Sequence, residues 1–234
     1  MKISPFLCLA VAATAWAAGP EAGTHDLFSR DAVDFRAVVT PPPAEDSITG
    51  EADRELAIML DLNRSPAQVE LAAHFEKFSV FTLLSDVMGV PCTAESLPRT
   101  AAFFEKVYAE TRPLILEAKS SWNRQRPYTY NLDLKPVVAK PATTSYPSGH
   151  SFASSVCAVL MSAAFPDRAV HWDKEARLVR FSRLYGGAHY PNDVIAGKRL
   201  GESAAKALLK SPQVQAALRE VRAEIIAYTS TKTG

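Results

Sequence analysis

One stretch decides the fold of this chain: Ser148 to Phe165, with the sequence SGHSFASSVCAVLMSAAF. It is built from small and apolar residues and contains no Asp, Glu, Lys or Arg. A run of this kind is typical of a helix that is packed on all sides, because small side chains let neighbouring helices approach closely. We therefore expect residues 148–165 to form the central helix of the protein.

Helix start signals occur on both sides of this stretch. Pro66 and Pro212 each follow a serine, which gives an N-cap residue with proline at the first helical position, and Pro98 opens another helix. Apolar stripes with helical spacing follow these starts, and the first of them continues towards Gly89. Strand-like alternation and hairpin dipeptides are nearly absent. The sequence predicts an all-α fold, a single-domain helical bundle.

Residues 1–17 have the features of a signal peptide. Lys2 gives a positive start, residues 6–15 are apolar, and Ala15 and Ala17 form a small-x-small cleavage pattern. The apolar run is shorter than the ~20 residues that a membrane-spanning helix needs, and no later uncharged segment reaches that length. We expect an exported protein, periplasmic or secreted, with no integral membrane segment after cleavage.

The next region, residues 18–48, is rich in proline, glycine and alanine and has no sustained periodicity. It is predicted to be an irregular arm that lies over the surface or is partly disordered. The all-helical domain then covers residues 49–234. Its 47% hydrophobic content, counted over the whole 234-residue chain, suits one domain with a sizeable core.

The charge balance excludes one class of partner. The formal net charge of the whole chain is +1, and the loss of Lys2 with the signal peptide would leave a neutral protein. A nucleic-acid-binding protein would show a basic footprint in its composition, so no nucleic acid is expected. A homodimer is the default assembly.

Export would leave two cysteines, Cys92 and Cys157, in a compartment where disulfides persist. Two interpretations are open, one disulfide or two buried thiols. Export and the even count favour a bridge between them.

Three separated clusters combine cations, histidines and a carboxylate. They are K-x6-RP from Lys119, SYPSGH from Ser145 to His150, and SR-x5-H-x3-D ending at Asp193. Guanidinium and ammonium groups can offset the charge of a phosphate dianion, and arginine does so with two parallel hydrogen bonds. The PSGH turn ahead of a helix presents backbone N–H groups and the positive helix end to an anion. All three clusters therefore indicate an anionic ligand.

The histidine of the third cluster has a candidate partner. His189 and Asp193 are four residues apart, so on a helix the carboxylate could hold one ring nitrogen and leave the other nitrogen's lone pair facing outward. An oriented imidazole beside cations describes a nucleophile that attacks phosphorus. Ligands arranged for a metal ion are not apparent, and no metal or cofactor is expected.

Together the clusters resemble the signature of the type-2 phosphatidic acid phosphatase superfamily, which includes vanadium haloperoxidases and bacterial class A non-specific acid phosphatases. The match covers eleven fixed positions in the right order, which makes it far more specific than a single short motif. The residues around the PSGH turn resemble the class A enzymes, although Thr144 and Ser151 stand where that signature has glycine and threonine. The fold implied by the resemblance is a helical bundle.

The resemblance also implies roles for individual residues. His189 would be the nucleophile that forms a phosphohistidine, Asp193 would hold its ring, and His150 would protonate the leaving alkoxide. Phosphate oxygens would be bound by Lys119, Arg126, Ser148, Gly149 and Arg183. The implied function is a metal-independent acid phosphatase that acts on small phosphomonoesters. Such a mechanism needs His150 protonated and His189 neutral at the start.

Other functions are compatible with parts of this pattern. Vanadate mimics phosphate, so a vanadate-dependent haloperoxidase is one alternative, to be tested with halide, peroxide and vanadate. A lipid phosphate phosphatase is disfavoured by the missing membrane spans. A non-catalytic phosphate-binding protein is disfavoured by His150, His189 and Asp193, since binding alone needs only the cations.

Overall fold

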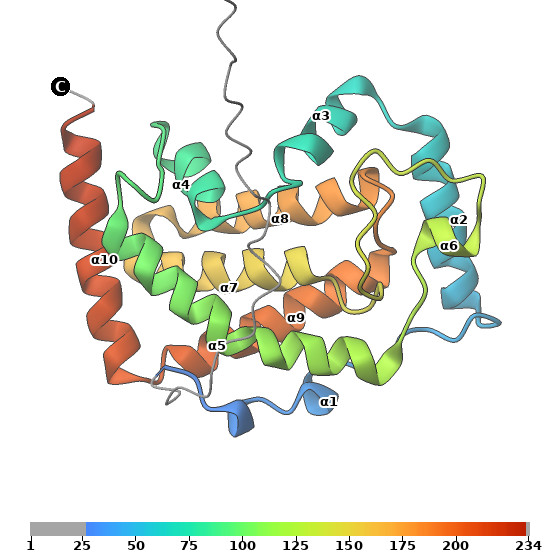
Figure 1. Cartoon of the computed structure of the whole chain (residues 1–234), viewed down its shortest axis with the longest axis horizontal. Coiled ribbons are helices and arrows are strands. Elements are labelled where there is room, and N and C mark those ends of the chain that lie inside the picture. Colours follow the sequence, from blue (N-terminus) through green and yellow to red (C-terminus); the bar gives the residue numbers. More distant parts are fainter. Residues whose placement is uncertain (1–26, 233–234) are drawn as a thin grey trace, which may run out of the picture.

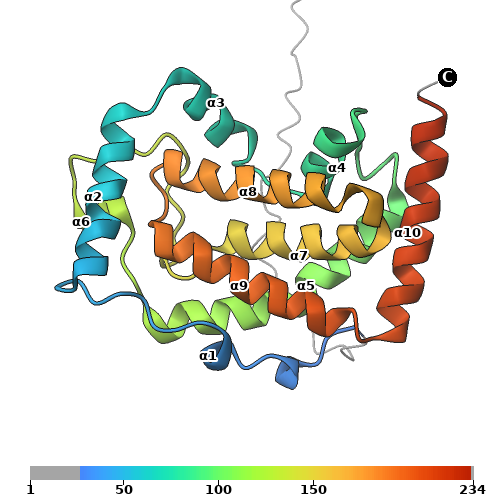
Figure 2. The ribbon, with the colours of Figure 1, turned by 180° about the vertical axis from the view of Figure 1, so that it is seen from behind.

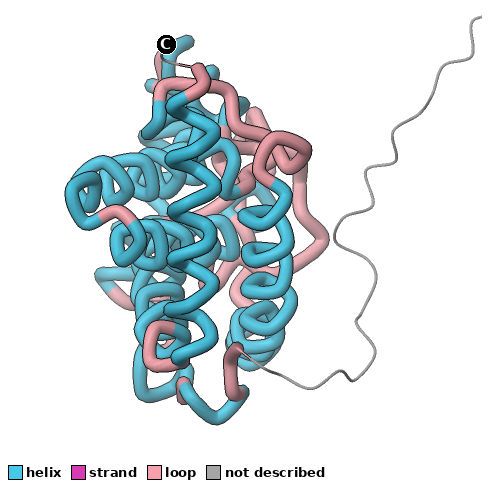
Figure 3. The backbone as a smooth tube through the Cα atoms, turned by 90° about the vertical axis from the view of Figure 1, so that its left-hand side faces the viewer, coloured by secondary structure: helices cyan, strands magenta, loops and turns pink. Residues whose placement is uncertain are grey.

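The computed structural model describes residues 27–232, and all regular elements in that range are helices (Figures 1 and 3). In chain order they are η1 (Arg30–Ala32), α1 (Phe35–Val38), α2 (Ile48–Asn63), α3 (Pro66–His74), α4 (Val80–Met88), α5 (Pro98–Trp122), α6 (Pro127–Tyr130), α7 (Gly149–Ala164), η2 (Pro166–Arg168), α8 (Ala169–Tyr185), α9 (Pro191–Leu208) and α10 (Pro212–Ser230). The predicted all-α fold is confirmed. The signal peptide predicted at residues 1–17 lies outside the described residues. Between residues 27 and 232 no helix is long and apolar enough to cross a membrane.

Helix α7 is the central helix, as residues 148–165 predicted, and it runs between α8 and α9 (Figure 2). Two glycines on α9 set the distance between α7 and α9. A Cβ atom on Gly197 would lie 2.3 Å from the carbonyl oxygen of Ser148, and one on Gly201 would lie 2.4 Å from that of Phe152. Only glycine fits at this approach, which also lets the Ser148 N–H donate to the Asp193 carbonyl at 2.9 Å.

The predicted helix starts are confirmed at Pro66, Pro98 and Pro212. The stripe predicted to run towards Gly89 is not one helix, however. Helix α3 ends at His74, and a new N-cap at Ser79 starts α4, which ends at Met88 and is followed by the C-cap Gly89 in the left-handed region (φ 72°). The break matters because its backbone faces the candidate site.

Residues 27–47 lie along the bundle as a mostly irregular segment with the two short helices η1 and α1 (Figure 1). Apolar side chains anchor this segment, since Phe28, Phe35 and Val39 are buried. The Phe28 N–H also donates to the Glu110 carboxylate on α5 at 2.8 Å. These contacts fix the described part of the predicted arm against the core.

The disulfide favoured by the sequence is wrong, because both cysteines are free thiols. Cys92 lies in the connection between α4 and α5, where its thiol contacts the Val90 carbonyl at 3.4 Å. Cys157 lies in the middle of α7, and its sulfur is 2.5 Å from the hydroxyl oxygen of Tyr108. Burial raises the pKa of the Cys157 thiol to about 12, so it is protonated and behaves as a small apolar side chain.

One end of the bundle collects the chain segments that carry the three sequence clusters. Helices α5 and α8 end there, and α7 and α9 begin there, close to α2 and α6 and opposite α10 (Figure 2). The beginnings of α7 and α9 direct their free N–H groups to this end. The fold thus gathers three sequence-distant clusters at one place.

Candidate active site

His189 occupies the turn between α8 and α9, two residues before the helix begins at Pro191. The helical pairing considered for His189 and Asp193 is therefore wrong, although the two side chains do meet. Asp193 is in the first turn of α9 and reaches back over the helix start. Its Oδ2 accepts the Tyr190 N–H at 2.9 Å and lies 3.3 Å from His189 Nδ1. His189 and Asp193 therefore meet because Asp193 caps the start of α9, and not because both lie on one face of a helix.

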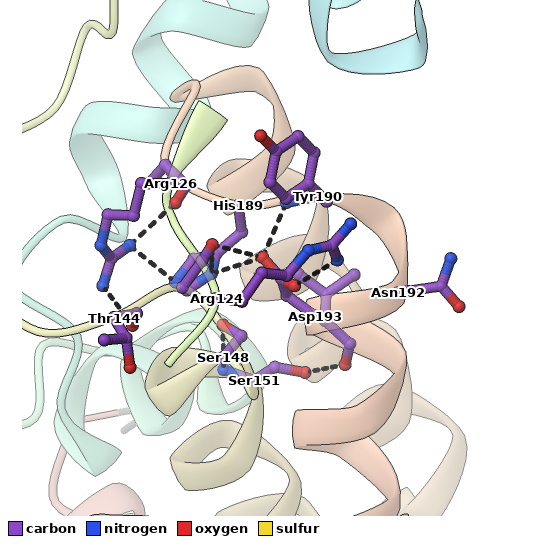
Figure 4. A network of polar contacts seen from close by, with 12 residues as sticks. Arg124, Arg126, Thr144, Ser148, Ser151, His189, Tyr190, Asn192 and Asp193 are labelled. Carbon is purple, nitrogen blue, oxygen red and sulfur yellow. Dashed lines mark hydrogen bonds and ion pairs between the residues drawn. The ribbon is translucent and has the colours of Figure 1, made fainter. Parts of the chain in front are cut away.

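The neighbours of His189 fix its tautomer. Its Nε2 lies 3.2 Å from Arg126 Nη1, and a guanidinium group only donates hydrogen bonds. Nε2 must therefore carry a lone pair, and the ring proton resides on Nδ1, facing Asp193. Burial, followed by the charges of Arg126 and Lys119, lowers the pKa of His189 well below 6.5. The ring is neutral, with a lone pair directed towards the cations (Figure 4).

Two of the predicted phosphate ligands are held by backbone carbonyls. Lys119, in the last turn of α5, donates to the Thr144 carbonyl at 2.6 Å. Arg126, just before α6, donates to the carbonyls of Thr143 at 2.7 Å and Ala188 at 2.8 Å. Figure 4 shows Arg126 between Thr144 and His189. These carbonyls orient the cations without neutralising their charge.

Arg183 is the least satisfied of the three cations. It lies in the last turn of α8 with 2% of its surface exposed, and its Nε and Nη1 have no hydrogen-bond partner within residues 27–232. Burial, with Arg126 nearby, lowers the pKa of Arg183 to about 10, and the same two causes lower that of Lys119 to about 7. Buried donors that lack partners and repel each other are the groups that an anion would stabilise.

The beginning of α7 completes the site. Ser148 is the N-cap, and its hydroxyl accepts the Ser151 N–H at 3.4 Å. Gly149 lies beside Lys119, since a Cβ atom added to it would be 4.0 Å from the lysine Cε. His150 donates from Nε2 to the Glu76 carbonyl at 3.1 Å, because a carbonyl can only accept. The break between α3 and α4 therefore orients His150.

His150 was predicted to be protonated beside a bound phosphate, and without an anion its pKa lies on the other side of neutrality. Burial and then the charge of Arg183 lower its pKa to about 3, despite the hydrogen bond to Glu76. The imidazole is therefore neutral at ordinary pH in this state. A positive His150 would be buried beside three other cations, and only an anion in the site would reverse that balance.

The structure brings all eight predicted site residues to this end of the bundle and adds four that the sequence interpretation missed. The missed residues are Asp53, Glu76, Arg124 and Ser145. Arg124 and Ser145 could have been noticed, because they stand inside or beside the predicted clusters. Asp53 and Glu76 belong to no motif and reach the site only through the packing of α2 and the α3–α4 break.

The sequence profile of the PAP2 superfamily matches the segment that carries all three clusters, residues 111–216. Residues 111–216 belong to the PAP2 superfamily. This PAP2 domain includes every predicted site residue, whereas Asp53 and Glu76 precede it.

The similarity to known proteins extends beyond residues 111–216. A non-specific acid phosphatase of Salmonella typhi is 26% identical over 213 residues, which cover 83% of this chain and 81% of that protein. A non-specific acid phosphatase of Providencia stuartii is 25% identical over 206 residues, covering 85% of this chain and 83% of that protein. In fold, the chain is similar to a bacterial vanadium-dependent iodoperoxidase, with a TM-score of 0.55 and 18% identity over 76% of this chain and 53% of that one.

Proposed function

We propose that this protein is an acid phosphatase that hydrolyses phosphomonoesters through a phosphohistidine at His189. The observation that carries the proposal is the neutral His189 ring, whose Nε2 lone pair faces buried cations. A base-like nitrogen in that setting is suited to attack an electron-poor phosphorus. The similarity to non-specific acid phosphatases supports the same reaction.

In the first step the phosphate group would bind to Arg183, Arg126 and Lys119, with the Ser148 hydroxyl and the Gly149 N–H at the positive end of α7. His189 Nε2 would form a bond to phosphorus while the ester P–O bond breaks. The imidazole becomes positive, and the Asp193 carboxylate at Nδ1 stabilises that charge.

The leaving alkoxide needs a proton, which His150 would supply. A bound phosphate dianion offsets the charge of Arg183, so the pKa of His150 rises when substrate binds. In the second step the neutral His150 would take a proton from water, whose oxygen attacks phosphorus and breaks the P–N bond. Inorganic phosphate leaves, and His189 is neutral again.

The remaining predictions concern the setting of the enzyme. We propose that residues 1–17 are a signal peptide and that the enzyme works in the periplasm or outside the cell. We further propose residues 18–48 as the arm and residues 49–234 as the catalytic domain. The homodimer stays a prediction.

The test is turnover of p-nitrophenyl phosphate by the wild type and by His189→Ala, with and without EDTA. We expect hydrolysis that EDTA leaves unchanged and vanadate blocks, a loss of roughly 10⁵-fold or more in the variant, and an acid-labile phosphate on His189 after a rapid neutral quench. His171→Ala is the matched control, because His171 is exposed on α8. Near-normal activity of His189→Ala would disprove the assignment of His189 as the nucleophile.

The haloperoxidase alternative has its own test. Oxidation of halide by peroxide in the presence of vanadate, without phosphatase turnover, would favour that alternative.

A further inference from the structure

The carboxylate that holds His189 is itself bound by an arginine outside the predicted clusters. Arg124 lies in the connection between α5 and α6, and its Nη1 donates to Asp193 Oδ1 at 2.8 Å. Its Nη2 donates to Asp53 Oδ2 at the same distance, and the guanidinium lies 4.2 Å over the Tyr190 ring. Figure 4 shows Arg124 beside Asp193. The cation is fixed between two carboxylates and an aromatic face.

Arg124 reaches Asp193 by a second route through the backbone. Its carbonyl accepts the Ser145 N–H at 2.8 Å, and the Ser145 hydroxyl donates to Asp193 Oδ2 at 2.5 Å. One residue therefore orients donors to both oxygens of the carboxylate. Such contacts restrict the carboxylate that faces His189 Nδ1.

Asp53 supports Arg124 from the opposite side. It is 3% exposed, and its Oδ1 accepts hydrogen bonds from the side chain of Asn192 at 2.9 Å and from its N–H at 3.3 Å. Helix α2 buries only Gly50, Asp53 and Ala57, so Asp53 is its one buried charge. Because α2 buries so little apolar surface, we infer that this ion pair helps to hold α2 in its position.

The charges in this series alternate, and their order has a chemical consequence. An Asp193 carboxylate without Arg124 would act with its full charge on the histidine and favour an imidazolium ring. An imidazolium has no lone pair on Nε2 and cannot attack phosphorus. Arg124 offsets part of that charge, and Asp53 limits how much it offsets. The basicity of the nucleophile therefore depends on both residues.

We propose that Arg124 is a positioning residue for His189, acting through Asp193, and that Asp53 determines how strongly it acts. The inference rests on the proposed function, because it assigns a purpose to keeping His189 neutral. The charged and titratable groups that face His189 from the surrounding elements are Asp193, Arg126, Lys119, Arg183 and His150. Arg124 and Asp53 lie one step further out, because Arg124 bonds to Asp193 and Asp53 bonds to Arg124.

The inference predicts that substitutions of Arg124 and of Asp53 shift the pKa of His189 in opposite directions. Arg124→Met removes a positive charge, so the pKa of His189 rises and the acid limb of kcat/KM moves to higher pH. We expect a shift of about one unit, the lower end of what a charge within ~4–6 Å produces. Asp53→Asn frees Arg124 to offset Asp193 more fully, so the limb moves to lower pH by less than this.

The experiment measures the pH profile with p-nitrophenyl phosphate and titrates the His189 ring nitrogens by NMR in the free enzyme. Arg124→Lys keeps the charge and should return the limb most of the way to the wild type. If Arg124→Met does not fold because Asp53 is left unpaired, the double variant with Asp53→Asn removes both charges and should give a smaller upward shift. Arg180→Met is the control, because Arg180 is also a buried arginine but pairs with Asp173 on α8 and not with Asp193.

Unchanged limbs, or shifts of the same sign in Arg124→Met and Asp53→Asn, would overturn the positioning role. Failure of the proposed function looks different, since the wild type itself would then show no turnover and no phosphohistidine. If the variants lost stability while the pKa of His189 stayed unchanged, the ion pair of Arg124 and Asp53 would have only a structural role. That result would also overturn the inference.

Discussion

The two sides of the site are built on opposite principles. On the nucleophile side, which comprises His189 and Asp193, the carboxylate receives hydrogen bonds from Ser145, Tyr190 and Arg124 besides its contact with the ring. On the anion side, two guanidinium nitrogens of Arg183 lack partners among residues 27–232. This side comprises the groups proposed to contact the phosphate or the leaving group: Lys119, Arg126, Ser148, Gly149, His150 and Arg183. The hydrogen-bonding groups of the nucleophile side have protein partners before substrate arrives, whereas on the anion side Arg183 keeps donors without one.

The difference follows from what each side must do. The nucleophile needs one orientation and one tautomer, which fixed protein contacts provide. The anion side must gain more from a doubly charged phosphate than from water or protein groups, so neutralising it with an internal carboxylate would weaken binding. Tests on the anion side show whether this comparison is right.

Among the tests on the anion side, the largest effect is expected for His150→Ala. Protonation of the leaving group matters most when that group is a poor one, so hydrolysis of alkyl phosphates should fall by about 10³-fold. Hydrolysis of p-nitrophenyl phosphate, whose phenolate leaves readily, should fall by about tenfold or less. The ratio of kcat/KM for the two substrates measures the difference. Equal losses would make His150 a phosphate ligand only.

A smaller effect is expected for Arg183→Lys. Lysine keeps the positive charge but not the planar fork, so the unpartnered Nε and Nη1 donors are lost. We expect kcat/KM to fall by about 10²-fold. Arg180→Lys, at a buried arginine on the same helix, is the control. Wild-type activity in Arg183→Lys would mean that the unsatisfied donors do not contact the phosphate.

The smallest effect concerns pH. The pKa of Lys119 is about 7 in the free protein, so above that pH its ammonium loses its proton and the anion side loses one charge. Sulfate keeps the same charge over this range, and its inhibition constant should rise several-fold between pH 6 and 8. Lys119→Arg should remove this dependence, because arginine stays protonated. If the inhibition constant of sulfate for the wild type did not change with pH, Lys119 would not contribute its charge to anion binding.

The sequence determined the helices and the chemistry because both depend on local signals. Proline after an N-cap residue marks Pro66 and Pro212 as helix starts, and the small residues of 148–165 indicate a central helix. The spacing of lysine, arginine and histidine in three clusters indicates an anion site. These features are readable because each depends on residues that are near neighbours in the chain.

Only the tertiary structure decided which atoms meet. The contact between Asp193 and His189 depends on where α9 begins, and the orientation of His150 depends on a carbonyl at the α3–α4 break. The positions of Cys92 and Cys157, which left both as free thiols, follow from the packing around each one. Asp53 belongs to no motif, and its ion pair with Arg124 spans 71 residues. Such contacts have no period or spacing in the sequence, because packing between distant helices creates them.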